Sequence, residues 1–206
     1  ALAVMLGADV GTSLVVQVFS FDLSWLSPLA IGGGVILHLS RKATRAGQIG
    51  RIAIGVGLII LALQMILQAA RPFTQAAGVK VIFGTLTGDP MFDLLIGALF
   101  TMLAWSSLAV VLLTAAFVAS GLIGLKVALF LVLGANLGGG LLALFATSGA
   151  SPAGRRVALG NLIFKLVGCA LTVPLLGHIE SALAWLDPDP QRLVVNFHTA
   201  FNLLLA

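Results

Sequence analysis

The feature that most constrains the fold is an apolar motif that occurs twice in the chain. Leu6-Gly-Ala-Asp-Val-Gly-Thr-Ser13 returns as Leu133-Gly-Ala-Asn-Leu-Gly-Gly-Gly140, and both copies lie inside long apolar stretches. A glycine-rich, polar interruption that recurs in two apolar segments is typical of transporters built from two repeats, each with a broken helix near the middle of the membrane. We therefore expect two repeats and a helix break at each copy of the motif.

The composition indicates a membrane protein. Hydrophobic residues make up 60% of the chain and charged residues 9%, whereas soluble domains carry about 25% charged residues. We predict an all-α, polytopic bundle of transmembrane helices surrounded by the lipid bilayer, with a bacterial inner membrane as the expected location of this multi-pass protein. The formal net charge is +4, but the cations form short clusters rather than one basic face, so nucleic-acid binding is not expected.

Apolar stretches that approach the roughly 20 residues needed to span a bilayer can be read from the sequence. Three are uninterrupted and a fourth runs to the end of the chain: Trp25–Leu39, Ile52–Ala70, Val157–Leu176 and Leu193–Ala206. The stretch Met91–Ser120 carries the triplet Trp105-Ser-Ser107 in its middle. Because both chain ends lie in apolar segments, we expect the chain to be a fragment of a longer protein.

Charges in the loops orient these spans, because cytoplasmic loops are enriched in Lys and Arg. Residues 41–51 carry four cations and no anion, and Arg155 and Arg156 mark a second basic loop, so both loops are predicted to be cytoplasmic. The loops near 71–93 and 177–191 are charge-balanced or acidic and are assigned to the outside. The loops that follow the two motif copies then fall on opposite faces, as inverted repeats require.

These assignments predict how one membrane domain is organised over residues 1–206. Residues 1–70 form the latter part of the first repeat, and residues 71–90 form an external linker. Residues 91–176 form the second repeat, and residues 177–206 form an external loop and the start of a further span.

Polar residues within the apolar stretches mark the expected site, because each costs free energy in a membrane unless it is paired or hydrated. Unwound backbone would offer carbonyls to a cation and helix N-terminal amides to an anion. The candidate ion-binding residues are Asp9, Gly134, Asn136 and Gly138, and the candidate substrate-binding residues are Thr12, Ser13, Ser106 and Ser107. Two alternatives stay open, namely Gly-xxx-Gly packing faces at Gly7/Gly11 and Gly134/Gly138, and bonding of Ser106 and Ser107 to the preceding turn of their own helix.

A second polar group follows the second motif copy. Asn161 and Lys165 are spaced i, i+4 and share one helix face. Lys165 lies about 13 Å along a helix from the nearest basic loop, close to the membrane midplane. Asp9 is the expected counter-charge, in either a functional or a purely structural ion pair. His198 and Asn202 repeat the i, i+4 spacing, and we expect Asn161, Lys165, His198 and Asn202 to tune the site.

The sequence carries no enzyme signature. It has no nucleotide-binding loop, zinc-ligand spacing or nucleophile triad, and the single cysteine, Cys169, excludes a disulfide framework. Glycines at 32–34 and 50–57 are interpreted as contacts between closely packed helices. We predict a non-enzymatic protein without a cofactor.

The ordered set of motifs resembles the type II sodium/phosphate cotransporter family, in particular its bacterial, PhoU-associated branch. The two motif copies resemble that family's Gly-Ala-Asn-Ile-Gly-Thr-Thr elements. Trp105–Leu108 stands where the family carries Gln-Ser-Ser-Ser. Arg155–Gly168 resembles its Arg-x-Ala-x-x-His-x-x-Phe-Asn helix, and Asn196–Asn202 resembles its Phe-His-Thr-x-Phe-Asn segment.

The resemblance implies sodium-coupled uptake of inorganic phosphate by alternating access, with Na⁺ as the coupling ion and a PhoU-like cytoplasmic domain or protein as a partner. This chain departs from the family at several positions: Trp105 replaces Gln, Gly139 and Gly140 replace two Thr, and Lys165 replaces Asn. We hypothesise that the Lys165 ammonium takes the place of one bound Na⁺. The alternatives are a non-transporting membrane platform for phosphate signalling and a transporter of another small anion.

Overall fold

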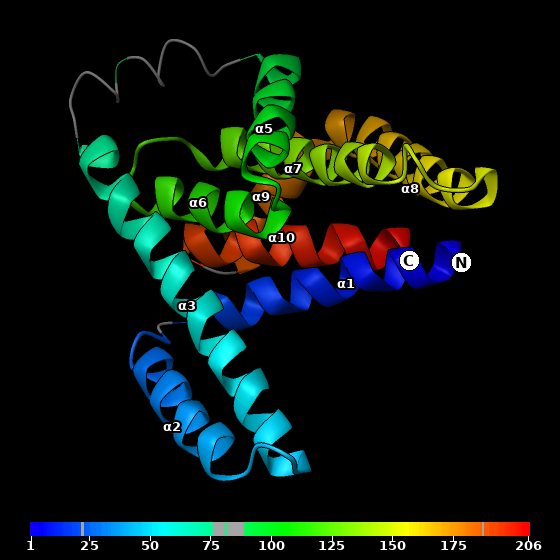
Figure 1. Cartoon of the computed structure of the whole chain (residues 1–206). Helices are drawn as coiled ribbons and strands as arrows, with labels where there is room; N and C mark the ends of the chain where they lie inside the picture. The colour runs from blue at the N-terminus through cyan, green and yellow to red at the C-terminus, as the bar shows by residue number, and fades with distance from the viewer. Residues whose placement is uncertain (22, 76–80, 82–88, 187) are drawn as a thin grey trace. The chain divides into compact units, whose positions relative to one another are not determined.

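The computed structural model describes residues 1–21, 23–75, 81, 89–186 and 188–206. The helices in chain order are α1 (Leu2–Phe19), α2 (Leu26–Ser40), α3 (Arg45–Gln75), α5 (Pro90–Ala104), α6 (Ser107–Ala119), α7 (Leu125–Ala146), α8 (Pro152–Thr172), the 3-10 turn η1 (Val173–Leu175), α9 (Leu176–Leu186) and α10 (Pro190–Leu205) (Figure 1). These described residues contain no strand. The all-α prediction is confirmed.

Four of the described helical segments are long and apolar enough to cross a bilayer: Leu2–Phe19, Arg45–Ile66, Leu125–Ala146 and Pro152–Leu183. The last of these runs from α8 through η1 into α9. Helices α2, α5 and α6 are shorter but also apolar. The predicted spans at 52–70 and 157–176 overlap this set, whereas the predicted linker at 71–90 lies largely outside the described residues.

The chain divides into two compact units, of which one contains Ala1–Ser20 and Pro72–Ala206 and the other contains Phe21–Arg71. The smaller unit pairs α2 with the first part of α3 through close backbone contacts at small residues. A Cβ atom on Gly34 would lie 2.7 Å from the Gly50 carbonyl oxygen, and Ser27 Oγ donates to the Gly57 carbonyl at 2.9 Å. Close helix packing, as predicted, occurs at these glycines.

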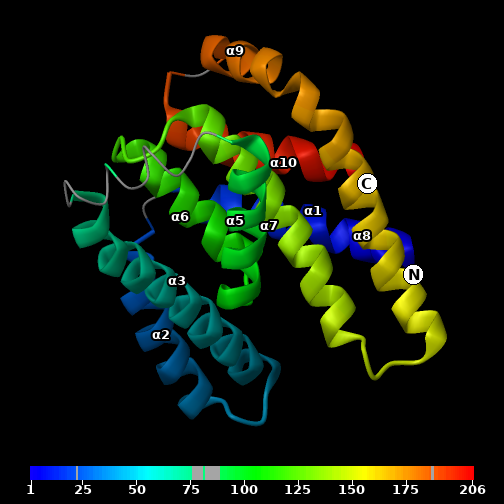
Figure 2. The same cartoon turned by 90° about the horizontal axis from the view of Figure 1, so that it is seen from above.

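Helix α7 forms the centre of the larger unit. Helix α5 lies along it, and α6, α8 and α10 pack around it (Figure 2). Of the residues in the apolar window of α7, 67% are buried, which agrees with its apolar sequence on all sides. Helix α1 packs on α10, α8 and α6. The pairs α7–α8 and α1–α10 form two layers in Figure 1.

The observed helix break lies at Trp105 rather than in the repeated motif. Trp105 adopts a left-handed conformation with φ of 52° between α5 and α6. Ser106 then caps α6 by accepting a hydrogen bond from the Ala109 amide at 3.2 Å. Residues 7–13 and 134–140 continue as α-helix, so the two predicted breaks are wrong. A helical glycine keeps its backbone hydrogen bonds, and an apolar environment offers the backbone no other partner.

Candidate functional site

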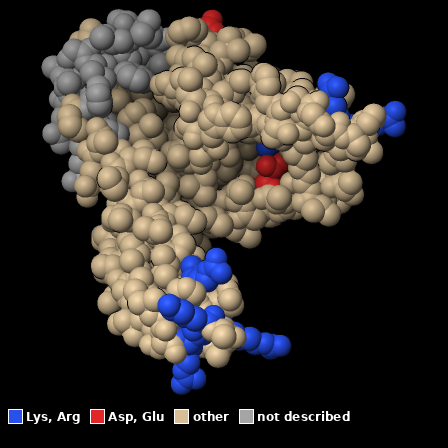
Figure 3. All heavy atoms as spheres, viewed as in Figure 1, with Lys and Arg blue, Asp and Glu red and all other residues tan. Residues whose placement is uncertain are grey.

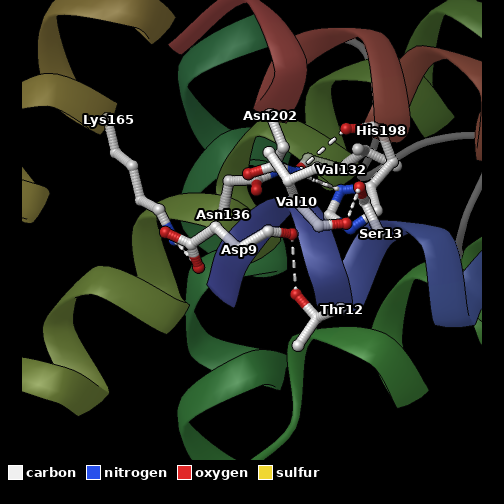
Figure 4. A network of polar contacts seen from close by, with 9 residues as sticks. All are labelled: Asp9, Val10, Thr12, Ser13, Val132, Asn136, Lys165, His198 and Asn202. Atoms are coloured by element: carbon white, nitrogen blue, oxygen red, sulfur yellow. Dashed lines mark hydrogen bonds and ion pairs between the residues drawn. The ribbon is translucent and has the colours of Figure 1, made fainter. Parts of the chain in front are cut away.

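A buried ammonium and a partly buried carboxylate meet in the larger unit. Lys165 Nζ on α8 donates to Asp9 Oδ1 on α1 at 2.9 Å, and the two side chains are 3% and 25% exposed, respectively. Figure 4 shows the lysine side chain extending toward the carboxylate. In Figure 3, acidic and basic atoms lie together in a hollow whose surroundings are uncharged residues. The predicted ion pair between Asp9 and Lys165 is present because α1 packs against α8.

The Lys165 ammonium lies beside Gly139 of α7, where the absence of a side chain leaves room for about one methyl group. A Cβ atom built on Gly139 would lie 3.6 Å from Lys165 Nζ and 3.8 Å from Ser107 Oγ. The amides of Ser107 and Leu108 precede the first intrahelical hydrogen bond of α6, so this helix end carries partial positive charge. An ammonium, a hydroxyl and a helix N-terminus are groups that bind oxyanions.

His198 on α10 is the centre of a buried hydrogen-bond network (Figure 4). Asn136 Nδ2 lies 3.1 Å and Asn202 Nδ2 lies 3.3 Å from His198 Nδ1. Each amide nitrogen also donates at 2.9 Å to its own helix, to the Val132 and His198 carbonyls. Because carbonyls only accept, the two amide nitrogens are donors and His198 Nδ1 is their acceptor. The proton of the neutral ring is therefore on Nε2.

Three polar atoms in this region are buried without a hydrogen-bond partner among the described residues: Asp9 Oδ2, Asn161 Oδ1 and His198 Nε2. The first two are acceptors, and the third is a donor in the tautomer deduced above. An unpaired buried polar atom costs about 1–3 kcal/mol. These atoms therefore mark positions where a bound ligand would be stabilising. Asn161 lies one helical turn from Lys165, and both side chains are buried.

The hydroxyl groups of the first motif copy bond to their own helix. Thr12 Oγ1 donates to the Asp9 carbonyl and Ser13 Oγ donates to the Val10 carbonyl, both at 2.8 Å. Thr12 is exposed, whereas Ser13 is fully buried. Such bonding to the preceding turn is common for hydroxyl side chains within helices. Both hydroxyl hydrogens are therefore donated to carbonyls of α1.

Gly134 and Gly138 face α5. A Cβ atom on Gly134 would overlap the Leu94 carbonyl oxygen, and one on Gly138 would lie 2.7 Å from the Ala98 carbonyl oxygen. Small residues at membrane helix interfaces allow two backbones to approach this closely. The packing alternative is therefore confirmed for this motif copy. The unwound backbone expected at these two glycines is wrong, because α7 stays helical through them, and their assignment as ion-binding residues stays a prediction.

Sequence reasoning missed a polar contact between α1 and α10. Gln17 Nε2 donates to Asn196 Oδ1 at 2.8 Å and to Thr199 Oγ1 at 3.1 Å. A usable signal was present in the spacing, since Asp9, Ser13 and Gln17 recur every four residues and share one face of a helix. A row of polar side chains in an apolar helix predicts polar partners on the neighbouring helices.

The apolar helices and the buried ion pair with unpartnered polar atoms define a helical membrane protein with a polar centre, as found in transporters. Sequence comparison assigns the family. The pattern of the Na⁺/Pi-cotransporter family matches residues 1–68 and 71–197, and the chain belongs to this family. The resemblance indicated by the motifs is thereby confirmed.

Curated relatives extend this assignment. The chain is 54% identical over 204 residues to the "Putative inorganic phosphate export protein YjbB" of Salmonella typhimurium and of Escherichia coli K12, which covers 99% of this chain and 38% of each relative. It is 26% identical over 206 residues to YqeW of Bacillus subtilis, covering 100% of this chain and 66% of that protein. The chain thus spans less than half the length of the YjbB relatives. No solved structure matches it.

Proposed function

We propose that the chain forms part of a secondary transporter that carries inorganic phosphate by alternating access between inverted repeats, with Na⁺ as the coupling ion. Family membership and the name of the YjbB relatives support phosphate as the substrate. The observation that carries the proposal is the buried Lys165 ammonium beside the space at Gly139 and Ser107. The four apolar segments are consistent with a multi-pass protein of a bacterial inner membrane.

Phosphate binding at this place follows from the chemistry of the groups present. Phosphate is an anion whose oxygens accept several hydrogen bonds. Lys165 supplies the positive charge, Ser107 supplies a hydroxyl, and the first turn of α6 supplies backbone amides. Ser106 holds that turn in place through its bond with the Ala109 amide. Burial strengthens each of these interactions, because little water competes for the donors.

Sodium suits the acceptor atoms of the same centre. Asp9 Oδ2 and Asn161 Oδ1 lack a donor within the described parts of the chain, and hard cations prefer oxygen ligands. A cation bound there would offset the negative charge that phosphate brings. Because Lys165 already contributes one fixed positive charge, we propose that fewer sodium ions accompany each phosphate than a site without this lysine would require.

The direction of transport in the cell depends on the gradients. When few sodium ions are coupled to each phosphate, the sodium gradient drives phosphate into the cell only weakly. Phosphate then leaves the cell when its internal concentration is high. The YjbB relatives are named as phosphate export proteins. We propose that this protein also moves phosphate out of the cell. A PhoU-like cytoplasmic domain or protein is the proposed partner.

Flux of radiolabelled phosphate in proteoliposomes tests this function. The intact protein is compared with Lys165→Met and with Ser181→Ala, a control in which the lost hydroxyl bonds only to its own exposed helix. We expect an imposed sodium gradient to stimulate the flux. Loss of a charged hydrogen bond worth about 1.5–3 kcal/mol should reduce the flux of Lys165→Met at least tenfold.

Ser181→Ala should transport like the wild type. A folded wild-type protein that neither binds nor moves phosphate would contradict the proposed function. That result would favour another small anion as the substrate, or a non-transporting platform for phosphate signalling.

A further inference from the structure

We infer that Lys165 changes partner during transport, from Asp9 in the empty site to phosphate in the loaded site, and that the released Asp9 carboxylate recruits the coupling Na⁺. This inference rests on the proposed function and adds its coupling step. Three observations carry it: the one-sided ion pair, the space at Gly139, and the unpartnered oxygens of Asp9 and Asn161.

The ion pair is held at only one of its carboxylate oxygens. Asp9 Oδ1 lies 2.9 Å from the ammonium, whereas Oδ2 is buried with no partner among the residues described. The Asp9 side chain is 25% exposed. The carboxylate therefore has a single partner to release, and its second oxygen can accept a cation.

The ammonium already borders the space assigned to phosphate. The Cβ position on Gly139 lies 3.6 Å from Lys165 Nζ and 3.8 Å from Ser107 Oγ. A lysine ammonium has three N–H donors, so it can contact an incoming phosphate before it leaves Asp9. The exchange needs only a rotation of a flexible side chain, and α8 can keep its place.

Charge balance makes the exchange require a cation. The empty pair carries no net charge, and phosphate adds at least one negative charge beside the Asp9 carboxylate. Two like charges this close together in a buried site repel each other strongly. A buried charge without compensation is strongly destabilising. Phosphate therefore binds well only if the released carboxylate acquires a positive partner.

Two unpartnered acceptor oxygens belong to Asp9 and to a residue on the same helix face as Lys165. Asp9 Oδ2 belongs to the carboxylate that is released, and Asn161 Oδ1 lies on a buried residue one helical turn before Lys165. Both are acceptors, and a Na⁺ ion would satisfy them while it neutralises the carboxylate. Phosphate and Na⁺ then bind cooperatively, because each removes a charge that disfavours binding of the other.

The variant Asp9→Asn separates this exchange from simple sodium binding, because it frees the ammonium and keeps the size of the side chain. Binding of radiolabelled phosphate is measured in detergent micelles, in NaCl and in choline chloride. We expect the wild type to bind about tenfold more tightly in NaCl, within the usual range of coupling between sites. Asp9→Asn should bind tightly in choline chloride with no gain from sodium, and Ser181→Ala should match the wild type.

A second measurement uses only the wild type. Because coupling is reciprocal, phosphate must raise the affinity for radiolabelled Na⁺ by the same factor by which Na⁺ raises that for phosphate. Equal sodium binding with and without phosphate overturns the exchange, even if Asp9→Asn does not fold. A folded Asp9→Asn protein that keeps the wild-type sodium dependence also overturns it, but leaves the proposed function standing. Absence of phosphate binding by the folded wild type in both salts overturns the proposed function itself.

Discussion

The two copies of the repeated motif share a residue pattern but lie in opposite environments. The apolar window of α7 is 67% buried, and that of α1 is 17% buried. Gly134 accommodates the backbone of α5, whereas Cβ atoms on Gly7 and Gly11 would meet no atom of the described residues within 4 Å. Asn136 is buried and held by two hydrogen bonds, whereas the partly exposed Asp9 carboxylate has one partner.

This difference teaches that a Gly-Ala-(Asn/Asp)-x-Gly pattern does not by itself determine the role of a membrane helix. In α7 the small residues bring two backbones together and the polar residue stabilises the packing. In α1 the glycines of the same pattern contact no described residue, and the polar residue is a charge that pairs with Lys165. Neighbouring helices decide between these roles, and the following substitutions test whether the two copies really differ.

The largest effect is expected from Asn136→Asp, which gives the second motif copy the aspartate of the first copy. Asn136→Asp replaces an amide that donates to His198 Nδ1 with a carboxylate that can only accept, at a position that is 2% exposed. An uncompensated charge at such a place costs about 3–5 kcal/mol. The free energy of unfolding, measured by SDS titration in mixed micelles, checks this prediction.

Asn136→Ala is the matched control, because it removes the same hydrogen bonds without adding a charge. It should cost about 1–3 kcal/mol. If Asn136→Asp were as stable as the wild type, the second copy would tolerate a charge as the first does, and the contrast between the two copies would be lost.

The equivalent glycines should respond differently to a single methyl group. Gly134→Ala forces a Cβ atom onto the Leu94 carbonyl oxygen, and we expect a loss of about 3 kcal/mol, at the upper end of the usual range for overpacked cores. Gly7→Ala has free space and should be neutral or up to about 1 kcal/mol more stable, since alanine favours helix. The same unfolding titration measures both variants, and equal changes would show that the copies are packed alike.

The smallest expected change concerns Gly139, whose counterpart in the first copy is Thr12. The methyl group of Gly139→Ala would make ordinary contacts of 3.6 Å and 3.8 Å with Lys165 Nζ and Ser107 Oγ, so the fold should persist. It would occupy the space proposed for phosphate, and we expect about tenfold weaker phosphate binding, or about 1.4 kcal/mol. Gly11→Ala is the control and should bind phosphate like the wild type. Unchanged phosphate binding by Gly139→Ala would indicate that phosphate binds elsewhere.

Parts of the site could be predicted from the sequence because charge is expensive at membrane depth. Lys165 needs a partner, and Asp9 lies in an apolar segment of its own, so the pair followed from electrostatics alone. The break at Trp105 and the contacts of Gln17 could not be assigned in the same way. Glycine content indicated breaks at residues 7–13 and 134–140. Both segments stay helical, because in an apolar medium the backbone finds its hydrogen-bond partners only within the helix.

The sequence by itself determined the helical membrane class, the family and the pairing of the two buried charges. These depend on local quantities, namely the hydration of each side chain and the need of every backbone group in an apolar medium for an internal partner. Only the tertiary structure decided which motif copy is packed, where the helix is interrupted, and that Gly139 leaves space beside Lys165 and Ser107. Those properties depend on the distances between segments far apart in the chain, which composition and spacing do not specify.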